Sequence, residues 1–540
     1  MRDVLSEPFQ RSYEGSAGSR VVVAAVDLGA TSGRVMVGVV EGGVVELHPI
    51  ARFLNIPVRT ADGLHWNVLD LYRNFVDGLR VAARDYPELA SIGIDSWAVD
   101  YALMRGGRML GTPFHYRDER NSASVAQTHA VVGAAELYRR NGLQHLPFTT
   151  IFQLGADADF LPLADTLLLI PDLFAFWLTG HAVSERTNAS TTGLLSVATG
   201  EWDVGLAERL GISASLLPPL VAPGDVIGTL SPTIAADLRT DASVVAVGSH
   251  DTASAVAAVP AADARFAYIS CGTWGLVGLE LQHPVLTDAS RKAGFTNERG
   301  LDGTVRFLHN VMGMWLLNET VRWWERSSMV RSEERSGGAN ADAAVASSGA
   351  RSADTGAAAV VLAVPDSDRT VSDETVSERA ALEGTADLAA LVAEAAALDE
   401  HVDLFDPNDP SFLAPDNMPS RIEDWLRARG LSVPTSRIAL VRCIIESLAA
   451  AFADTVARAV TLAEHPIDLV HIVGGGSQNG LLCQLVADRL RMPVLAGPLE
   501  ATAIGNVLVQ AQALGAVEPG LAALRAVVAH SYEPTRYEPR

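Results

Sequence analysis

The chain has few cysteines, little basic charge for its size and no long apolar run. Its 540 residues include only Cys271, Cys443 and Cys483, which match no CxxC metal pattern. So few cysteines, odd in number, favour a reduced, cytoplasmic setting. No uninterrupted apolar run reaches transmembrane length, and residues 1–20 lack the apolar segment of a secretory signal. We therefore expect no membrane span, and a disordered tail over residues 1–20.

Basic residues are outnumbered by acidic ones. With 41 Lys and Arg against 64 Asp and Glu, the formal net charge is −23. Nucleic acids and anionic membrane surfaces would repel such a chain, which excludes both as general partners. An anionic ligand could bind only where basic groups are gathered locally.

The length and the order of elements predict two large domains. A chain of 540 residues exceeds what one core supports. β-Branched runs and helical spacing predict a βββαβ order in the first half. The expected elements are strands at Val21–Val26, Val35–Val40 and Val44–Phe53, a helix at Asn67–Arg84 with Leu69, Tyr72, Phe75 and Leu79 at helical spacing, and a strand at Ser91–Ile94. A similar cycle restarts near Phe266, which indicates a duplicated architecture.

One segment has little to bury. Between about 327 and 385 the chain is mostly Ala, Ser, Asp, Glu, Arg and Gly, without an aromatic residue. Such a composition predicts a flexible insert without chemistry of its own.

The segment Asp27–Arg34 is the first candidate site. It separates two β-branched runs, so it reads as a hairpin turn that can point backbone N–H groups at an anion. Arg34 adds positive charge, Thr31 and Ser32 add hydroxyl groups, and Asp27 is placed to reach a hydrated Mg²⁺. An ordinary hairpin is the alternative, and these residues alone leave both open.

The second candidate is Gly248–Ala255, between an apolar strand and a helix-compatible run. Asp251 is either the cap of the helix or a general base that takes a proton from a hydroxyl group during phosphoryl transfer. His250 is either a structural histidine or a hydrogen-bond donor to a sugar.

Two further turns carry glycine. The segment Ser270–Trp274 resembles the first loop more weakly, and its Thr273 could contact phosphate. In the second, the buried strand Leu469–Val473 runs into Gly474, Gly475 and Gly476, where a flat ligand could lie against the backbone. The spacing of a dinucleotide-binding GxGxxG loop is absent there.

These four motifs, in this order, resemble those of the FGGY carbohydrate kinase family. Finer matches resemble its rhamnulokinase branch, and together they cover the chain from about 21 to 535 apart from the insert. They read SIGIDSWAVDYA from Ser91, HYRDER from His115, LQHLPFTTIFQL from Leu143, TNASTTGLL from Thr187, LHNVMGMWLL from Leu308, PNDPSFLAPDNMPSRI from Pro407 and AGPLEATAIGN from Ala496.

The resemblance implies an α/β fold with two ribonuclease-H-like domains of the actin, hexokinase and chaperone type and a cleft between them. The N-terminal domain would span 21–258, and the C-terminal domain 264–535. The implied reaction is transfer of the ATP γ-phosphate to the 1-hydroxyl of L-rhamnulose, with Mg²⁺. Alternatives are a kinase for another ketose or polyol, of the xylulose or fuculose type, and a non-enzymatic ATP-dependent switch.

The resemblance also implies the site residues. Asp251 would be the proton acceptor. The ATP-binding residues would be Ala30, Thr31, Ser32, Gly33, Arg34, Thr273, Asn318 and Gly475, and the sugar-binding residues Ala98, His250, Asp251, Thr252 and Asn310. Two of these depart from the family pattern: Ala98 stands where Gly is frequent, and Asn318 where Gln is common.

Overall fold

The computed structural model describes residues 18–327, 388–414 and 416–540. Most of the expected insert and of the expected N-terminal tail therefore lies outside the described residues. The chain divides into two units: Met1–Gly313 with Phe452–Arg540, and Met314–Ala451. Each is described by itself.

The first unit contains a six-stranded sheet ordered β12-β13-β6-β1-β2-β3. Strands β1 (Val21–Leu28), β2 (Ser32–Glu41) and β3 (Val44–Leu54) are antiparallel neighbours. Parallel pairing joins β1 to β6 (Ser91–Ser96), and β6 to β13 (Ser243–Val245). The edge strand is β12 (Val226–Thr229). The predicted βββαβ order is confirmed.

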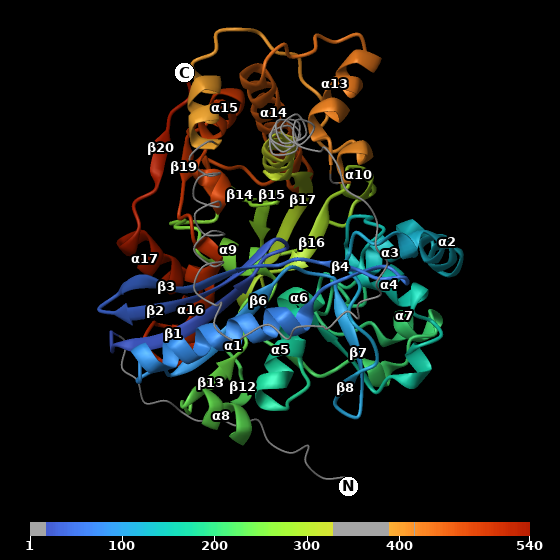
Figure 1. Cartoon of the computed structure of the whole chain (residues 1–540), viewed down its shortest axis with the longest axis vertical. Helices are drawn as coiled ribbons and strands as arrows, with labels where there is room; N and C mark the ends of the chain where they lie inside the picture. Colours follow the sequence, from blue (N-terminus) through green and yellow to red (C-terminus); the bar gives the residue numbers. More distant parts are fainter. Residues whose placement is uncertain (1–17, 328–387, 415) are drawn as a thin grey trace, which may run out of the picture. The chain divides into compact units, whose positions relative to one another are not determined.

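Helices α1 (Val68–Asp85), α5 (Ile170–Thr179) and α8 (Pro232–Leu238) pack on one face of this sheet (Figure 1). In α1 the buried positions are Leu71, Phe75 and Leu79, whereas Leu69 is 65% exposed. The apolar stripe thus runs through Leu71 rather than Leu69, because positions four apart share a helix face.

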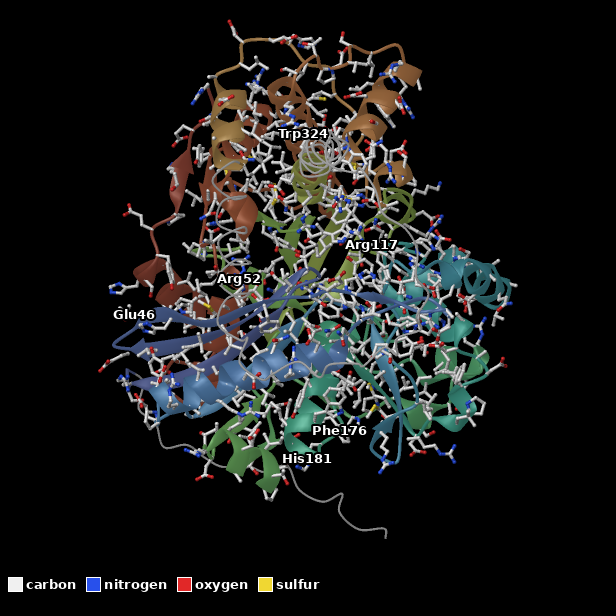
Figure 2. All side chains as sticks on the ribbon, viewed as in Figure 1. Glu46, Arg52, Arg117, Phe176, His181 and Trp324 are labelled. Carbon is white, nitrogen blue, oxygen red and sulfur yellow. The ribbon has the colours of Figure 1, made fainter. Side chains whose placement is uncertain are left out.

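Short elements fill the segment between β6 and β13. They include a small sheet ordered β8-β7-β9, on which Phe176 of α5 packs (Figure 2). The bounds are β4 Val58–Arg59, β5 Leu64–His65, β7 Tyr101–Arg105, β8 Arg108–Met109, α2 Ser122–Val131, α3 Ala134–Asn141, α4 Thr150–Ala156, β9 Thr166–Leu169, β10 Ser184–Glu185, α6 Arg186–Ala189, α7 Val204–Arg209 and β11 Leu220–Val221.

A seven-stranded sheet completes the first unit, in the order β16-β17-β15-β14-β18-β19-β20. Its strands are β14 (Phe266–Cys271), β15 (Trp274–Leu281), β16 (Thr296–Arg299), β17 (Val305–Met312), β18 (Leu469–Val473), β19 (Val494–Ala496) and β20 (Thr535–Tyr537). Helices α10 (Asp288–Lys292) and α15 (Gly480–Leu490) belong to the same region. The sequence indicated β14, β15 and β18, but not β16 and β17.

A second core cluster joins the two sheets through α9 (Asp251–Ala257), α16 (Ala501–Ala513) and α17 (Leu521–Ser531). It contains Val23 from β1, Tyr268 from β14 and Val507 from α16, all buried. Helices α9 and α16 approach closely at a glycine: a Cβ on Gly505 would lie 1.9 Å from the carbonyl oxygen of Ser254.

The second unit is helical in its described part. It contains a helix over 315–327, another over 388–396, α13 (Met418–Ala428) and the first part of α14 (Arg437–Ala463). The indole N–H of Trp315 donates to the carbonyl of Phe412 (3.2 Å), which ties the first helix to the loop before α13. Among the residues that the structure describes, no helix combines the length and apolarity needed to cross a membrane.

The glycine at the α9–α16 crossing gives a stability prediction. Gly505→Ala forces a methyl group against backbone that cannot move aside, so we expect the free energy of unfolding to fall by about 3 kcal/mol. Gly205→Ala in α7 is the matched control, since its Cβ would meet only ordinary contacts, and we expect it to gain about 0.5–1 kcal/mol. Urea unfolding of both variants checks this, and equal stability of the two would contradict it.

Candidate active site

The turn between β1 and β2 is closed by its own backbone and clamped by Asn55. The N–H of Gly29 donates to the carbonyl of Ser32 (2.9 Å). Asn55 donates its backbone N–H to Thr31 (3.0 Å) and its side-chain amide to Gly29 (2.9 Å). These bonds fix the turn that carries Ala30–Gly33. The motif analysis did not identify Asn55, which lies beyond the hairpin, just after β3.

Arg34 is held at the base of this turn by two carboxylates. Its Nε donates to Asp27 (2.9 Å), its cross-strand neighbour, and its Nη1 pairs with Glu500 just before α16. Asp27, then Glu500, raise the pKa of the guanidinium, which therefore stays charged. Glu500 is a contact that local sequence reading did not find, because it lies 466 residues away.

Three aspartates converge beside Arg34. Register pairs Asp27 of β1 with Asp95 of β6, and the next residue, Ser96, forms a bridge with His250. Burial, then Asp27, raises the pKa of Asp95. Burial also raises the pKa of Asp251, and Asp27 raises it further. The structure thus brings Asp27, Arg34 and Asp251 into one electrostatic neighbourhood.

Asp95 is the buried member of this group. Its Oδ2 accepts from Asn506 of α16 (2.6 Å), whereas its Oδ1 has no hydrogen-bond partner among the described residues. Asn506 accepts from Gln510 (2.6 Å), which in turn accepts from Ser91 (2.6 Å). This ladder of buried side chains ties β6 to α16.

Asp251 is the first residue of α9, and His250 occupies the cap position without a capping hydrogen bond. The capping interpretation of Asp251 is therefore wrong, and its carboxylate is left for other contacts. Its Oδ1 accepts from the hydroxyl of Thr252 (3.1 Å) and lies 3.5 Å from Nε2 of His250. Glu185 fixes the preceding turn by accepting from the N–H (3.0 Å) and hydroxyl (2.9 Å) of Ser249.

Ala98 lies on a loop organised by the buried carboxylate of Asp100. That carboxylate accepts from Trp66 (2.6 Å), Trp97 (3.1 Å) and Gln153 (2.8 Å). Burial raises the pKa of Asp100 to about 7, although each of these donors opposes the rise. The neighbouring Val99 has φ +68°, a strained conformation for a β-branched residue. The loop is therefore held in one conformation by its surroundings.

Thr273 and Gly475 lie on adjacent turns of the second sheet. The first turn is closed by a bond from Gly272 N–H to Trp274 (2.9 Å). The second packs on the first, since a Cβ on Gly476 would lie 2.2 Å from Sγ of Cys271. Gly475 itself is exposed, with open space where a Cβ would be. The glycine run is thus required for packing at Gly476 and leaves backbone accessible at Gly475.

Asn310 lies on β17. It lies on the same face as Arg306, four residues earlier, which contacts His250 at 3.1 Å. Four residues of strand span roughly 13 Å. The amide of Asn310 donates to Gln144 (3.1 Å). Asn318 belongs to the second unit, in the helix over 315–327, and its contact with nucleotide stays a prediction.

Two family models match the chain. The model described as the N-terminal domain of the FGGY family of carbohydrate kinases matches residues 22–258, and the C-terminal domain of that family matches residues 267–514. A protein named rhamnulokinase from Pectobacterium carotovorum is 38% identical over 527 residues, which cover 96% of this chain and 93% of the relative. A rhamnulokinase from Bacteroides thetaiotaomicron is 35% identical over 523 residues, 96% and 95% of the two chains.

Solved structures share the fold at low identity. The xylulose kinase from Lactobacillus acidophilus matches with a TM-score of 0.69 at 15% identity, over 96% of this chain and 94% of that one. The glycerol kinase from Plasmodium falciparum matches with a TM-score of 0.67 at 12% identity, over 97% and 95%. These similarities confirm the predicted fold class.

The buried Asp95 gives a pH-dependent prediction. Because the folded state raises its pKa, the parent binds more protons folded than unfolded, so Asp95 contributes less stability as pH rises. Asp95→Asn removes this dependence and keeps an acceptor for Asn506. The variant should gain stability relative to the parent as pH rises above the unfolded-state pKa of about 4, by at most about 1.4 kcal/mol per pH unit. Urea unfolding at several pH values checks this, and a difference that is flat with pH would contradict it.

Proposed function

Because this chain belongs to the FGGY family of carbohydrate kinases and is an ATP-dependent sugar kinase, we propose that its sugar is L-rhamnulose. The products would be L-rhamnulose 1-phosphate and ADP. Full-length similarity to two named rhamnulokinases supports this substrate. The observation that carries the proposed chemistry is the convergence of Arg34, Asp27 and Asp251 beside one closed turn.

In this proposal the turn binds the phosphates of ATP. The backbone N–H groups of Ala30–Gly33 and the side chains of Thr31, Ser32 and Arg34 face the β- and γ-phosphates. The turns that carry Thr273 and Gly475 hold the nucleoside end, with Asn318 as a further contact. Because phosphoryl transfer passes through a loose transition state, positioning and charge stabilisation supply most of the rate enhancement.

Asp251 acts as the proton acceptor. As the sugar 1-hydroxyl oxygen bonds to the γ-phosphorus and the bond to ADP breaks, the hydroxyl proton passes to the carboxylate of Asp251. Burial raises the pKa of this carboxyl, which strengthens it as a base, while His250 opposes the rise. His250, Thr252, Ala98 and Asn310 would bind the sugar.

Magnesium fits this group of carboxylates as a hydrated ion brought by the triphosphate. In the described part of the chain, no group of three or more metal-ligating side chains could hold an ion by itself. Asp27, with the unpartnered Oδ1 of Asp95 next to it in register, provides the one or two carboxylates that Mg²⁺ usually takes. When bound, the ion would neutralise charge on the transferred phosphoryl group.

The proposal also includes the limits of the two domains and the cellular compartment of the enzyme. The halves 21–258 and 264–535 would close on both substrates and exclude water. Three free, buried cysteines favour a cytoplasmic enzyme.

A panel of ketoses tests the substrate. ADP release would be measured with L-rhamnulose, xylulose and fuculose, and without sugar. We expect kcat/KM to be highest for L-rhamnulose and turnover to be low without sugar. A higher kcat/KM for another ketose would overturn L-rhamnulose as the substrate.

Asp251→Asn tests the proton acceptor. The amide keeps the shape of the side chain and cannot accept the proton, so kcat should fall by about 10²–10⁴-fold. ATP affinity, measured by calorimetry, should change little. Asp237→Asn, an exposed acid at the end of α8, is the control for loss of one negative charge. Near-parent kcat in Asp251→Asn would remove this residue from the role.

A further inference from the structure

We propose that Glu298 and Arg306 are positioning residues that keep an N–H on Nε2 of His250 directed at Asp251. The inference rests on the proposed role of Asp251 as proton acceptor. Glu298 lies on β16 and Arg306 on β17, the two strands that the sequence did not indicate. Neither residue belongs to the motifs discussed above.

The three side chains form a buried triangle at one ring nitrogen. Nη2 of Arg306 lies 3.1 Å from Nδ1 of His250 and 3.1 Å from Oε2 of Glu298. Oε2 of Glu298 in turn lies 3.2 Å from Nδ1. Arg306 is fully buried, and His250 and Glu298 are each 6% exposed. Strand register sets this arrangement, since Glu298 and Arg306 are direct cross-strand partners.

The triangle offers a partner for either protonation state of His250. A neutral ring can accept at Nδ1 from Arg306, and an imidazolium can donate from Nδ1 to Glu298. In both states the remaining proton is on Nε2, which lies 3.5 Å from Oδ1 of Asp251. The pair therefore serves both forms of the ring without turning Nε2 into an acceptor.

Glu298 is a charged partner in this arrangement. Burial alone would raise its pKa, but Arg306 and His250 hold the pKa of Glu298 below its usual value.

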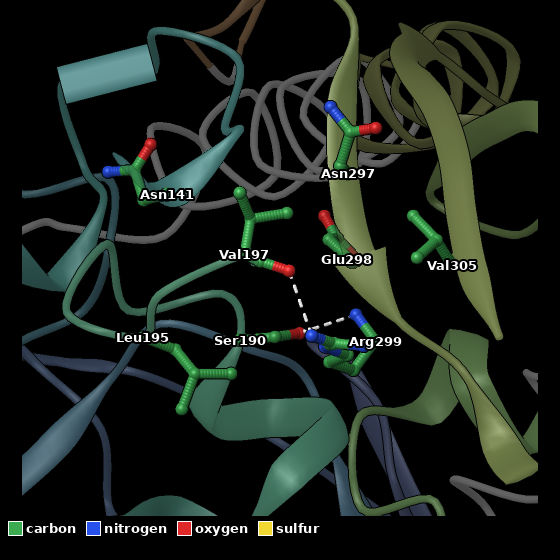
Figure 3. Close-up of a pocket in the computed structure, with 8 residues that line it drawn as sticks. All are labelled: Asn141, Ser190, Leu195, Val197, Asn297, Glu298, Arg299 and Val305. Atoms are coloured by element: carbon green, nitrogen blue, oxygen red, sulfur yellow. Dashed lines mark hydrogen bonds between the residues drawn. The ribbon is translucent and has the colours of Figure 1, made fainter. Parts of the chain in front are cut away.

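Glu298 also borders a small cavity lined by Asn297, Arg299 and Val197, among others (Figure 3). There Arg299 donates from Nη2 to the carbonyl of Val197 (2.8 Å) and from its N–H to Ser190 (2.9 Å). Arg299 is thus engaged elsewhere.

The other charged groups around the site have different partners. Asp27 of β1 is paired with Arg34 of β2, and Asp95 of β6 is bonded to Asn506. Glu185 of β10 is bonded to Ser249 and Thr187. Loss of Glu298 would therefore leave a charged His250 with Asp251 as its remaining carboxylate partner in the described part of the site.

Glu298→Gln tests the assignment through the pH profile. Glu298→Gln removes the carboxylate that pairs with a charged His250, so the ring would stabilise the ionised form of Asp251 less strongly. The acid limb of kcat/KM should move up by about 0.5–1 pH unit. We also expect kcat to fall about tenfold at pH 7, with KM for ATP changed less than about twofold. Glu298→Asp, which keeps the charge, should recover part of the loss.

A double-mutant cycle separates positioning from support of the fold. In a His250→Asn background, Glu298→Gln should change kcat by less than about twofold, because its effect acts through the ring. Glu280→Gln is the matched control: Glu280 is the partner of Arg306 on the other neighbouring strand, and it forms a buried pair with Arg525 (2.8 Å). It should leave the pH profile unchanged.

Equal losses from Glu298→Gln with and without His250, or an acid limb that does not move, would overturn the inference. If Glu298→Gln does not fold, Arg306→Lys enters the same cycle. The two hypotheses fail separately: high activity of Asp251→Asn refutes the proposed proton acceptor, whereas an uncoupled Glu298 refutes only the positioning role.

Discussion

The close packing of α16 against β6 and α9 is the constraint on which the site depends. Helix α16 comes from the end of the chain, yet its Asn506 bonds to Asp95 and its Gly505 touches the backbone of α9. Just before the helix, Glu500 reaches Arg34. Helix α16 and the residue before it therefore fix the positions of β6, Arg34 and α9. Few side chains could replace Gly505 or Asn506, because one provides space and the other provides a donor to a buried acid.

At the proposed active site, burial and neighbouring acids oppose ionisation of the carboxylates. Burial opposes ionisation of Asp95 and Asp251, and Asp27 opposes it further. Arg34 lowers the pKa of Asp95 and His250 lowers the pKa of Asp251, which partly offsets these effects. A group of acids held together in this way is costly to the fold and is typical of sites where protons or phosphates are handled. Structural acids such as Glu280 are paired instead with one buried arginine.

Local patterns predicted much of this molecule, and long-range pairing set the rest. The Val-rich runs gave β1, β2 and β3 because β-branched spacing is a local property, and the glycine turns at 29–33 and 474–476 were found for the same reason. Strands β16 and β17 were missed, since their polar residues Glu298 and Arg306 are buried only because they pair with each other and with His250. Asn55 and Glu500 were missed because their partners are distant in sequence. Leu69 was placed on the wrong face of α1, which shows the limit of periodicity read from one short helix.

Arg34 pairs with two carboxylates, and this would affect turnover in the proposed mechanism. In the proposed site, a phosphate that binds Arg34 would have to replace the contact with Asp27 or with Glu500. Part of the attraction between Arg34 and the phosphate would thereby be offset by the loss of an ion pair. Glu500, just before α16, could pair with Arg34 again after transfer, so the two carboxylates would weaken binding of the nucleotide and favour release of ADP.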